Sequence, residues 1–151
     1  MKNLILRIFN PKQMAAALKR EDVTNIEFAT YTFIVISLTV YSIYLSWWNV
    51  HTTELFFFLD LLLEILGNIL LVVITYSINK KGDDKRFWYR FICLSIPVGI
   101  LTGLFMIILS ILLSIFVTVD STFDLIDLCI LFSGLMFATF YLVKYMRIIS
   151  K

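Results

Sequence analysis

The run LFMIILSILLSIF, from Leu104 to Phe116, contains no charged residue and no alternation of polar and apolar positions. A membrane β-strand would alternate over roughly ten residues, so this run predicts a helix. Four long, mainly apolar stretches without such alternation lie at residues 26–48, 55–76, 91–117 and 123–145. Each is longer than the roughly 20 residues with which a helix crosses about 30 Å of hydrocarbon. With 60% hydrophobic residues among 151, the chain is predicted to be an all-α membrane protein.

The predicted fold is an antiparallel bundle of four transmembrane helices, residues 26–145. The connections 49–54 and 118–121 are short, which favours consecutive spans as antiparallel neighbours. All 13 Lys and Arg precede the first span, lie between the second and third, or lie at or after the end of the fourth, where Lys144 is next to its last residue. Because basic loops stay in the cytoplasm, both termini are predicted to be cytoplasmic. Abundant Lys, Ile, Asn and Phe suit an AT-rich genome, so we expect a bacterial inner (plasma) membrane.

Residues 1–25 are predicted to form a basic amphipathic arm at the cytoplasmic surface, and residues 146–151 a short tail. The stretch MKNLILRIF can place apolar side chains on one helical face, as in a helix lying at the headgroups. Asn10 and Pro11 form an N-cap and first-position pair for a second short helix. Thr24 and Glu27 have the spacing of a capping box at the start of the first span.

Polar side chains recur along one face of the second span, where Asp60, Glu64 and Asn68 are each four residues apart. Asp127 lies a turn deeper than Asp124 in the fourth span. Facing lipid would cost an ionised acid several kcal/mol, so this stripe is expected to face other helices or water. Two hypotheses remain open: a cation or proton pathway, or a protonated Glu64 that hydrogen-bonds across a helix or subunit interface.

The third span carries small residues on nearly one face, which predicts close packing against a helix of the same chain or of a second copy. These residues are Ser95, Gly99, Gly103, Ser110 and Ser114.

Signatures of enzymes, metals and cofactors are lacking in the sequence. His51 is the one histidine, so a His pair cannot form within a chain. Cys93 and Cys129 are expected at opposite sides of the membrane, which argues against a shared metal or disulfide. An intramembrane aspartyl protease using Asp60 and Asp127 has no supporting motif. We therefore expect a protein without catalytic activity, metal or cofactor.

The leading functional hypothesis is a homo-oligomeric membrane anchor or sensor that recruits a cytosolic protein, for example in a bacterial defence or immunity system. The alternative is an oligomeric ion or proton channel or transporter that uses Asp60, Glu64 and Asp127. Anionic lipid headgroups are expected partners of the basic inner face, and direct nucleic-acid binding is not expected. The residues expected to contact a partner or lipid are Lys12, Lys19, Arg20, Lys80, Lys81, Lys85 and Arg86.

Overall fold

The computed structural model of the chain describes residues 2–48, 54–116 and 123–151. Within these ranges the side chains of residues 2–5, 41–48, 54–57, 60, 114–116 and 123–125 are not described. The regular elements of the described ranges are all helices, which confirms the predicted all-α class. They are α1 (Lys2–Phe9), α2 (Pro11–Lys19), α3 (Asn25–Trp48), α4 (Glu54–Lys81), α5 (Phe87–Phe116) and α6 (Phe123–Ile149).

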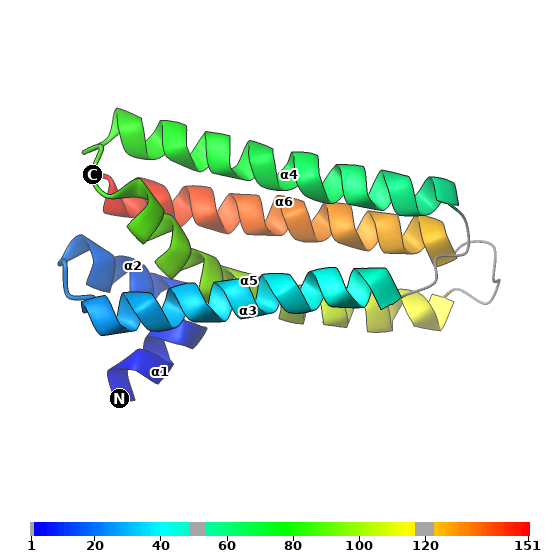
Figure 1. Cartoon of the computed structure of the whole chain (residues 1–151), viewed down its shortest axis with the longest axis horizontal. Coiled ribbons are helices and arrows are strands. Elements are labelled where there is room, and N and C mark those ends of the chain that lie inside the picture. The colour runs from blue at the N-terminus through cyan, green and yellow to red at the C-terminus, as the bar shows by residue number, and fades with distance from the viewer. Residues whose placement is uncertain (1, 49–53, 117–122) are drawn as a thin grey trace.

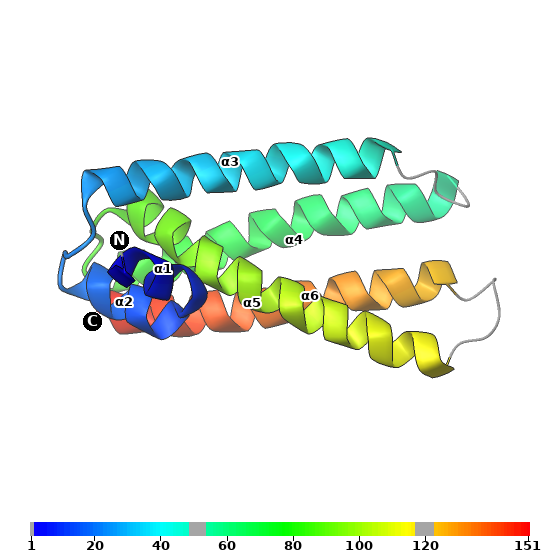
Figure 2. The same ribbon diagram turned by 90° about the horizontal axis from the view of Figure 1, so that it is seen from below.

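The four long helices run along the length of the molecule, and each reverses the direction of the one before it (Figure 1). The two chain ends, the short helices α1 and α2, and the turn between α4 and α5 all lie together at one end (Figure 2). We call this the basic end: residues 2–31, the turn 82–86, the first turns of α5, and the last turns of α4 and α6 with residues 150–151. The remainder of the four long helices is the distal half.

Helix α6 is central to the packing, because α4 and α5 both pack against it, while α3 packs on α5. The expectation that consecutive spans are neighbours is therefore wrong for α3 and α4, which do not form a closely packed pair among the described residues. Glycines explain the preference for α6. A Cβ added at Gly67 of α4 would lie 2.7 Å from Leu135, and one at Gly134 of α6 would lie 2.6 Å from Met106. At both glycines a larger residue would require the Leu135 or Met106 side chain to shift.

Three helices have segments long and apolar enough to cross a membrane: Leu61–Lys81, Phe87–Leu113 and Ile126–Ile149. These segments indicate a multi-pass membrane protein. The described apolar part of α3, Asn25–Val40, is shorter than a span.

At the basic end the helices extend beyond the apolar stretches of the sequence. Helix α4 continues past Tyr76 to Lys81, α5 begins at Phe87 rather than at 91, and α6 continues past Tyr145 to Ile149. A helix satisfies its own backbone, so it need not end where the hydrocarbon ends. The added turns carry polar side chains, and several of them are buried in the protein.

Buried side chains are concentrated at the basic end. Met14, Leu94 and Met146 have 0% exposure and come from α2, α5 and α6. In the distal half, by contrast, large apolar side chains such as Ile107, Ile111 and Phe132 are exposed. The hydrophobic core is thus displaced toward one end of the bundle.

Candidate functional site

Helix α2 is capped and packed against the other helices of the basic end. The Asn10 side chain caps it by accepting hydrogen bonds from the backbone N–H groups of Lys12 and Gln13 at 3.1 and 3.2 Å, which confirms the predicted N-cap. Met14 and Leu18 are buried, and the helix packs against α5 and α6. Its basic residues Lys12 and Lys19 are consequently held on the exposed side.

Arg7 fastens α1 to the connection between α2 and α3. Its guanidinium donates to the Asp22 carboxylate at 2.6 Å and to the backbone carbonyl of Asp22 at 2.9 Å, and it pairs with Glu27 at 3.3 Å. Glu27 also accepts from the Thr24 backbone N–H at 2.9 Å, while its own N–H donates to the Thr24 hydroxyl at 3.2 Å. This reciprocal pair confirms the predicted capping box. Arg7 therefore pairs with two acids of the basic end and adds no free positive charge to the surface.

A second ion pair closes the turn between α4 and α5. Arg90 is 7% exposed, and its guanidinium binds both carboxylate oxygens of Asp83, one of them at 2.6 Å. The same group donates to the fully buried Asn79 side chain at 3.0 Å. The hydrogen bonds from Arg90 lower the pKa of Asp83 to about 2. This network holds the turn residues 82–86 against the ends of both helices.

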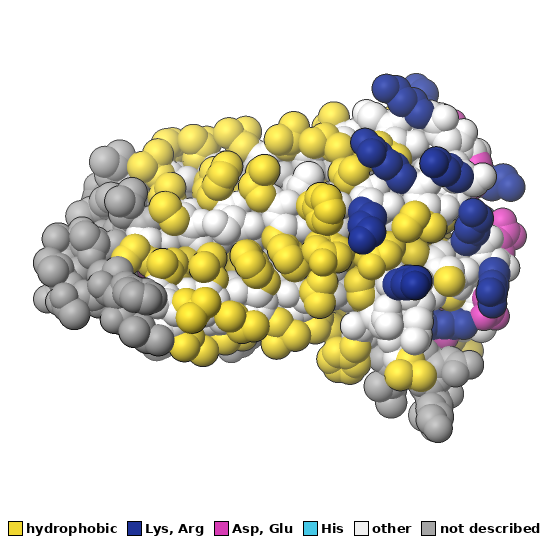
Figure 3. All heavy atoms as spheres, turned by 180° about the vertical axis from the view of Figure 1, so that it is seen from behind, with side chains coloured by type: hydrophobic (Ala, Val, Ile, Leu, Met, Phe, Trp, Pro, Cys, Tyr) yellow, Lys and Arg dark blue, Asp and Glu magenta, His cyan; other side chains and the backbone are white. Residues whose placement is uncertain are grey.

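Since these internal pairs use three acids, the charge that remains on the surface is strongly positive. Among the described residues, only Glu21 and Asp84 are exposed acids of the basic end outside the ion pairs. Figure 3 shows Lys and Arg side chains gathered over this end. We call the exposed cations the basic face; its described members are Lys12, Lys19, Arg20, Lys80, Lys81, Lys85, Arg86, Lys144, Arg147 and Lys151.

All seven basic residues that the sequence nominated as contacts are exposed members of this face. None of them lies within ion-pair distance of a carboxylate in the described part of the chain. Their charges are therefore available to a lipid or to a protein.

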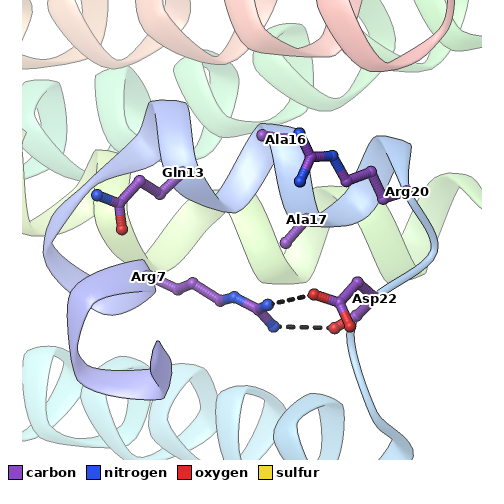
Figure 4. A pocket seen from close by; sticks show the side chains of 6 residues that line it. All are labelled: Arg7, Gln13, Ala16, Ala17, Arg20 and Asp22. Carbon is purple, nitrogen blue, oxygen red and sulfur yellow. Dashed lines mark hydrogen bonds and ion pairs between the residues drawn. The ribbon is translucent and has the colours of Figure 1, made fainter. Parts of the chain in front are cut away.

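One hollow of about 230 Å³ lies beside α2 and is lined by Arg7, Gln13, Ala16, Ala17, Arg20 and Asp22. Figure 4 shows the Arg7–Asp22 pair on one side of it and Arg20 on another. Because Asp22 neutralises Arg7, Arg20 supplies the uncompensated charge of this hollow. A single cation of this kind attracts an anion only weakly.

The intramembrane polar residues are not enclosed by the described part of the single chain. The Glu64 side chain is half-buried, and Asp127 is exposed. Asn68 is exposed and donates to the Glu64 backbone carbonyl of its own helix at 2.9 Å. Asp60 lies one turn before Glu64, and its side chain is outside the described set. Whether this stripe is functional stays a prediction.

The small-residue face of α5 does not pack within the chain at its glycines. A Cβ added at Gly99 or Gly103 would meet nothing within 4 Å. The Ser95 hydroxyl donates to the Ile92 carbonyl of its own helix at 2.8 Å, and Ser110 is exposed. The Ser114 side chain is outside the described set. Packing against a second copy stays a prediction for this face.

Comparisons with protein-family models, with curated proteins and with solved structures found no match. The described residues also contain no group of three or more His, Cys, Asp or Glu placed to hold a metal ion. The arrangement of the basic end, with fixed exposed cations on packed short helices, is suited to attracting anions.

Sequence reasoning did not single out Arg90, Asn79, Arg147 or Lys151. Arg90 was counted among loop cations, although it begins the second turn of α5 and is buried. The sequence signal for this ion pair is that Asp83 and Arg90 lie only seven residues apart. Arg147 and Lys151 gain significance only because α6 ends beside α4, which the sequence does not reveal.

Proposed function

We propose that the protein is a four-span anchor or sensor of a bacterial inner membrane, with both termini in the cytoplasm, that recruits an acidic cytosolic protein through its basic face. The observation that carries this proposal is the set of exposed, unpaired cations collected at one end of the bundle. The positive potential of these cations attracts an acidic partner and speeds its association with the basic face. Adjacent anionic headgroups hold the basic end at the membrane.

The proposal includes α3 as the fourth span. Helix α3 is 24 residues long, packs against α5, and runs antiparallel to α4. Figure 2 shows that α3 and α5 are close at the basic end and diverge toward the other end. If α4, α5 and α6 cross the bilayer, a helix of this length packed on α5 crosses it too. The concentration of Lys and Arg at the end that carries both termini favours the cytoplasm for that end.

Orientation can be tested by thiol labelling in intact cells, with Cys93 and Cys129 replaced by Ser. A cysteine in the basic turn, Asp84→Cys, should react with a membrane-impermeant reagent only after the cells are opened. A cysteine in the connection between α5 and α6, Val119→Cys, should react in intact cells. The opposite pattern would reject the proposed orientation.

Recruitment can be tested with the protein in lipid nanodiscs as an affinity support for cytosolic extract, followed by mass spectrometry. We expect a specific acidic protein to be retained at low salt and released as salt screens the charges. Replacing five cations of α2 and the turn by Gln should abolish its retention: Lys12, Lys19, Arg20, Lys85 and Arg86. A Lys81→Gln, Arg147→Gln variant removes two cations from the other side of the face and should weaken retention less. Equal retention by all three forms would contradict recruitment through this face.

A proton or ion pathway is the second candidate, favoured by the exposure of Asp127 and Asn68 on the surface of the single chain. Polar groups at this level would be unfavourable in lipid, so copies around an axis would be needed to cover them. Flux through proteoliposomes tests this candidate. Proton flux that Glu64→Gln abolishes would support conduction, and absence of flux at matched protein content would exclude it.

A further inference from the structure

A hollow of about 290 Å³ lies between the ends of α4 and α6 and is more basic than the one beside α2. It is lined by Ile78, Lys81, Gly82, Arg147, Ser150 and Lys151. Three of these six residues are cations, and none is an acid. Since like charges gathered around one hollow repel each other, a bound anion would relieve that repulsion.

The walls of this hollow are held in place by close packing. Ser150 is 5% exposed, and its hydroxyl and N–H both donate to the Met146 carbonyl, at 2.8 and 3.0 Å. A Cβ added at Gly82 would lie 2.5 Å from the Ser150 Cβ and would collide with the Ser150 carbonyl oxygen, so only glycine allows this approach. The end of α6 is thereby fixed against the turn after α4, with Lys81 and Arg147 on the two sides.

Capping of the helix ends does not account for these cations. The Ile78 and Asn79 carbonyls of α4 accept from the N–H groups of Gly82 and Asp84 at 3.0–3.1 Å. The Met146 carbonyl of α6 is used by Ser150. Because backbone and hydroxyl groups satisfy these carbonyls, the Lys81 and Arg147 side chains are left without a described hydrogen-bond partner.

The hollow also lies at the level of phosphate groups in a bilayer. Exposed Tyr76 lies five residues before Lys81, which is about 8 Å along the helix at 1.5 Å per residue. On α6, Lys144 lies 5.7 Å from the ring centroid of the partly exposed Tyr141, one turn before Arg147. Aromatic rings with an adjacent Lys are typical of the membrane–water boundary. The hollow is therefore just on the water side of that boundary.

We propose that the hollow between α4 and α6 binds a phosphate group, held by Lys81, Arg147 and Lys151 with Ile78 as its apolar wall. Arg supplies paired donors that match phosphate oxygens, and Lys adds compact charge. The phosphate can belong to an anionic lipid headgroup or to a free phosphate compound. The inference deepens the proposed function, because it rests on the same cytoplasmic membrane surface.

The test compares three forms of the full chain: wild type, a hollow variant (Lys81→Gln, Arg147→Gln) and a control variant (Lys12→Gln, Lys19→Gln). The two variants lose equal charge, and all four positions are exposed, so folding should survive; circular dichroism checks this. Each form is purified in neutral detergent and titrated with phosphatidylglycerol, and bound lipid is counted by native mass spectrometry. A second arm adds inorganic phosphate at constant ionic strength.

We expect wild type and control to bind one phosphatidylglycerol per chain with equal affinity, and the hollow variant to bind at least about tenfold more weakly. Displacement of the lipid by inorganic phosphate would support a free phosphate compound as the ligand, and its failure to displace would support the lipid. Equal affinity in all three forms, or equal weakening in both variants, would overturn the site. Recruitment is assigned to the cations of α2 and the turn 82–86, and phosphate binding to Lys81 and Arg147, so the two proposals can fail separately.

Discussion

The basic end and the distal half of this protein use the same apolar residue types in opposite ways. At the basic end Leu94 and Met146 are fully buried, whereas in the distal half Ile107 and Ile111 are each 58% exposed. Water makes apolar burial favourable, but lipid chains are as apolar as the side chains themselves. The chain therefore forms a packed core at the basic end. In the distal half its apolar side chains are exposed, as expected for contact with lipid.

Polar groups follow the same division. The ion pairs of Arg7 and Arg90 and two helix caps are all at the basic end. In the distal half the Thr39, Asn68 and Thr139 side chains donate to carbonyls of their own helix. The buried Thr102 hydroxyl has no hydrogen-bond partner among the described residues. A surface that must present fixed charges benefits from such a rigid support. The difference is consistent with the proposal that a partner binds at the basic end.

The largest expected effect comes from breaking the buried network, by Arg90→Ala. This change removes the partner of Asp83 and leaves the buried Asn79 side chain without its donor. We expect a loss of about 2–3 kcal/mol in the free energy of unfolding, because the buried Asn79 oxygen loses its donor while Asp83 stays partly exposed to solvent. Denaturant titration in mild detergent measures it, and Lys80→Ala on the exposed side of α4 is the control. A loss below about 1 kcal/mol would show that the network does not hold the basic end.

Glycine substitutions should next separate the two regions. Gly82→Ala places a methyl group 2.5 Å from the Ser150 Cβ and against the Ser150 carbonyl oxygen, so the tail or the turn must move. We expect destabilisation of about 1–3 kcal/mol. Gly99→Ala meets nothing within 4 Å, so it should be neutral or slightly stabilising. Thermal unfolding of both variants provides the measurement, and the opposite ranking would contradict the packing described for the tail.

Local signals in the sequence predicted the local structure well. Asn10, Thr24 and Glu27 act as caps because capping depends only on neighbours a few residues apart. The apolar runs likewise predicted the all-helical class and the helices long enough to cross a membrane.

Contacts between distant segments could not be predicted in the same way. Gly99 and Gly103 have the spacing of a packing motif, yet within the chain the glycines in close contact are Gly67, Gly82 and Gly134. The spacing shows that one face of the helix carries small residues, but it does not show which helix packs against that face. For the same reason the convergence of Lys81 with Arg147 was not apparent, because it depends on α6 lying beside α4.

Weakening the capping box should have a smaller, local effect. Glu27→Ala removes both the acceptor for the Thr24 N–H and one partner of Arg7. We expect a loss of about 1–2 kcal/mol and faster hydrogen exchange in the first turn of α3. Glu27→Gln keeps an acceptor for the cap and should lose less. If Gln and Ala behave alike, the ion pair rather than the cap holds this turn.

Acid should weaken the basic end through Asp83. Its pKa is lowered from 3.8 to about 2 in the folded protein, so its contribution is complete above pH 3.8 and is lost as pH falls through about 2. The stability difference between wild type and Asp83→Asn should therefore shrink over that range. Unfolding measured at several pH values gives the difference, and other carboxylates titrate equally in both proteins. A difference that does not change with pH would contradict the pairing.

The smallest expected effect on folding is that of Gly103→Leu in the distal half. A Cβ at Gly103 meets nothing within 4 Å, so the single chain has space for it, and thermal stability of the monomer should be nearly unchanged. If copies of the chain pack through the small-residue face of α5, a leucine at position 103 would hold the two backbones apart. The oligomeric mass in detergent should then fall, while Lys12→Gln leaves it unaltered. An unchanged mass would mean that the open glycines of α5 face lipid, and that the distal half contributes a membrane span without an interface.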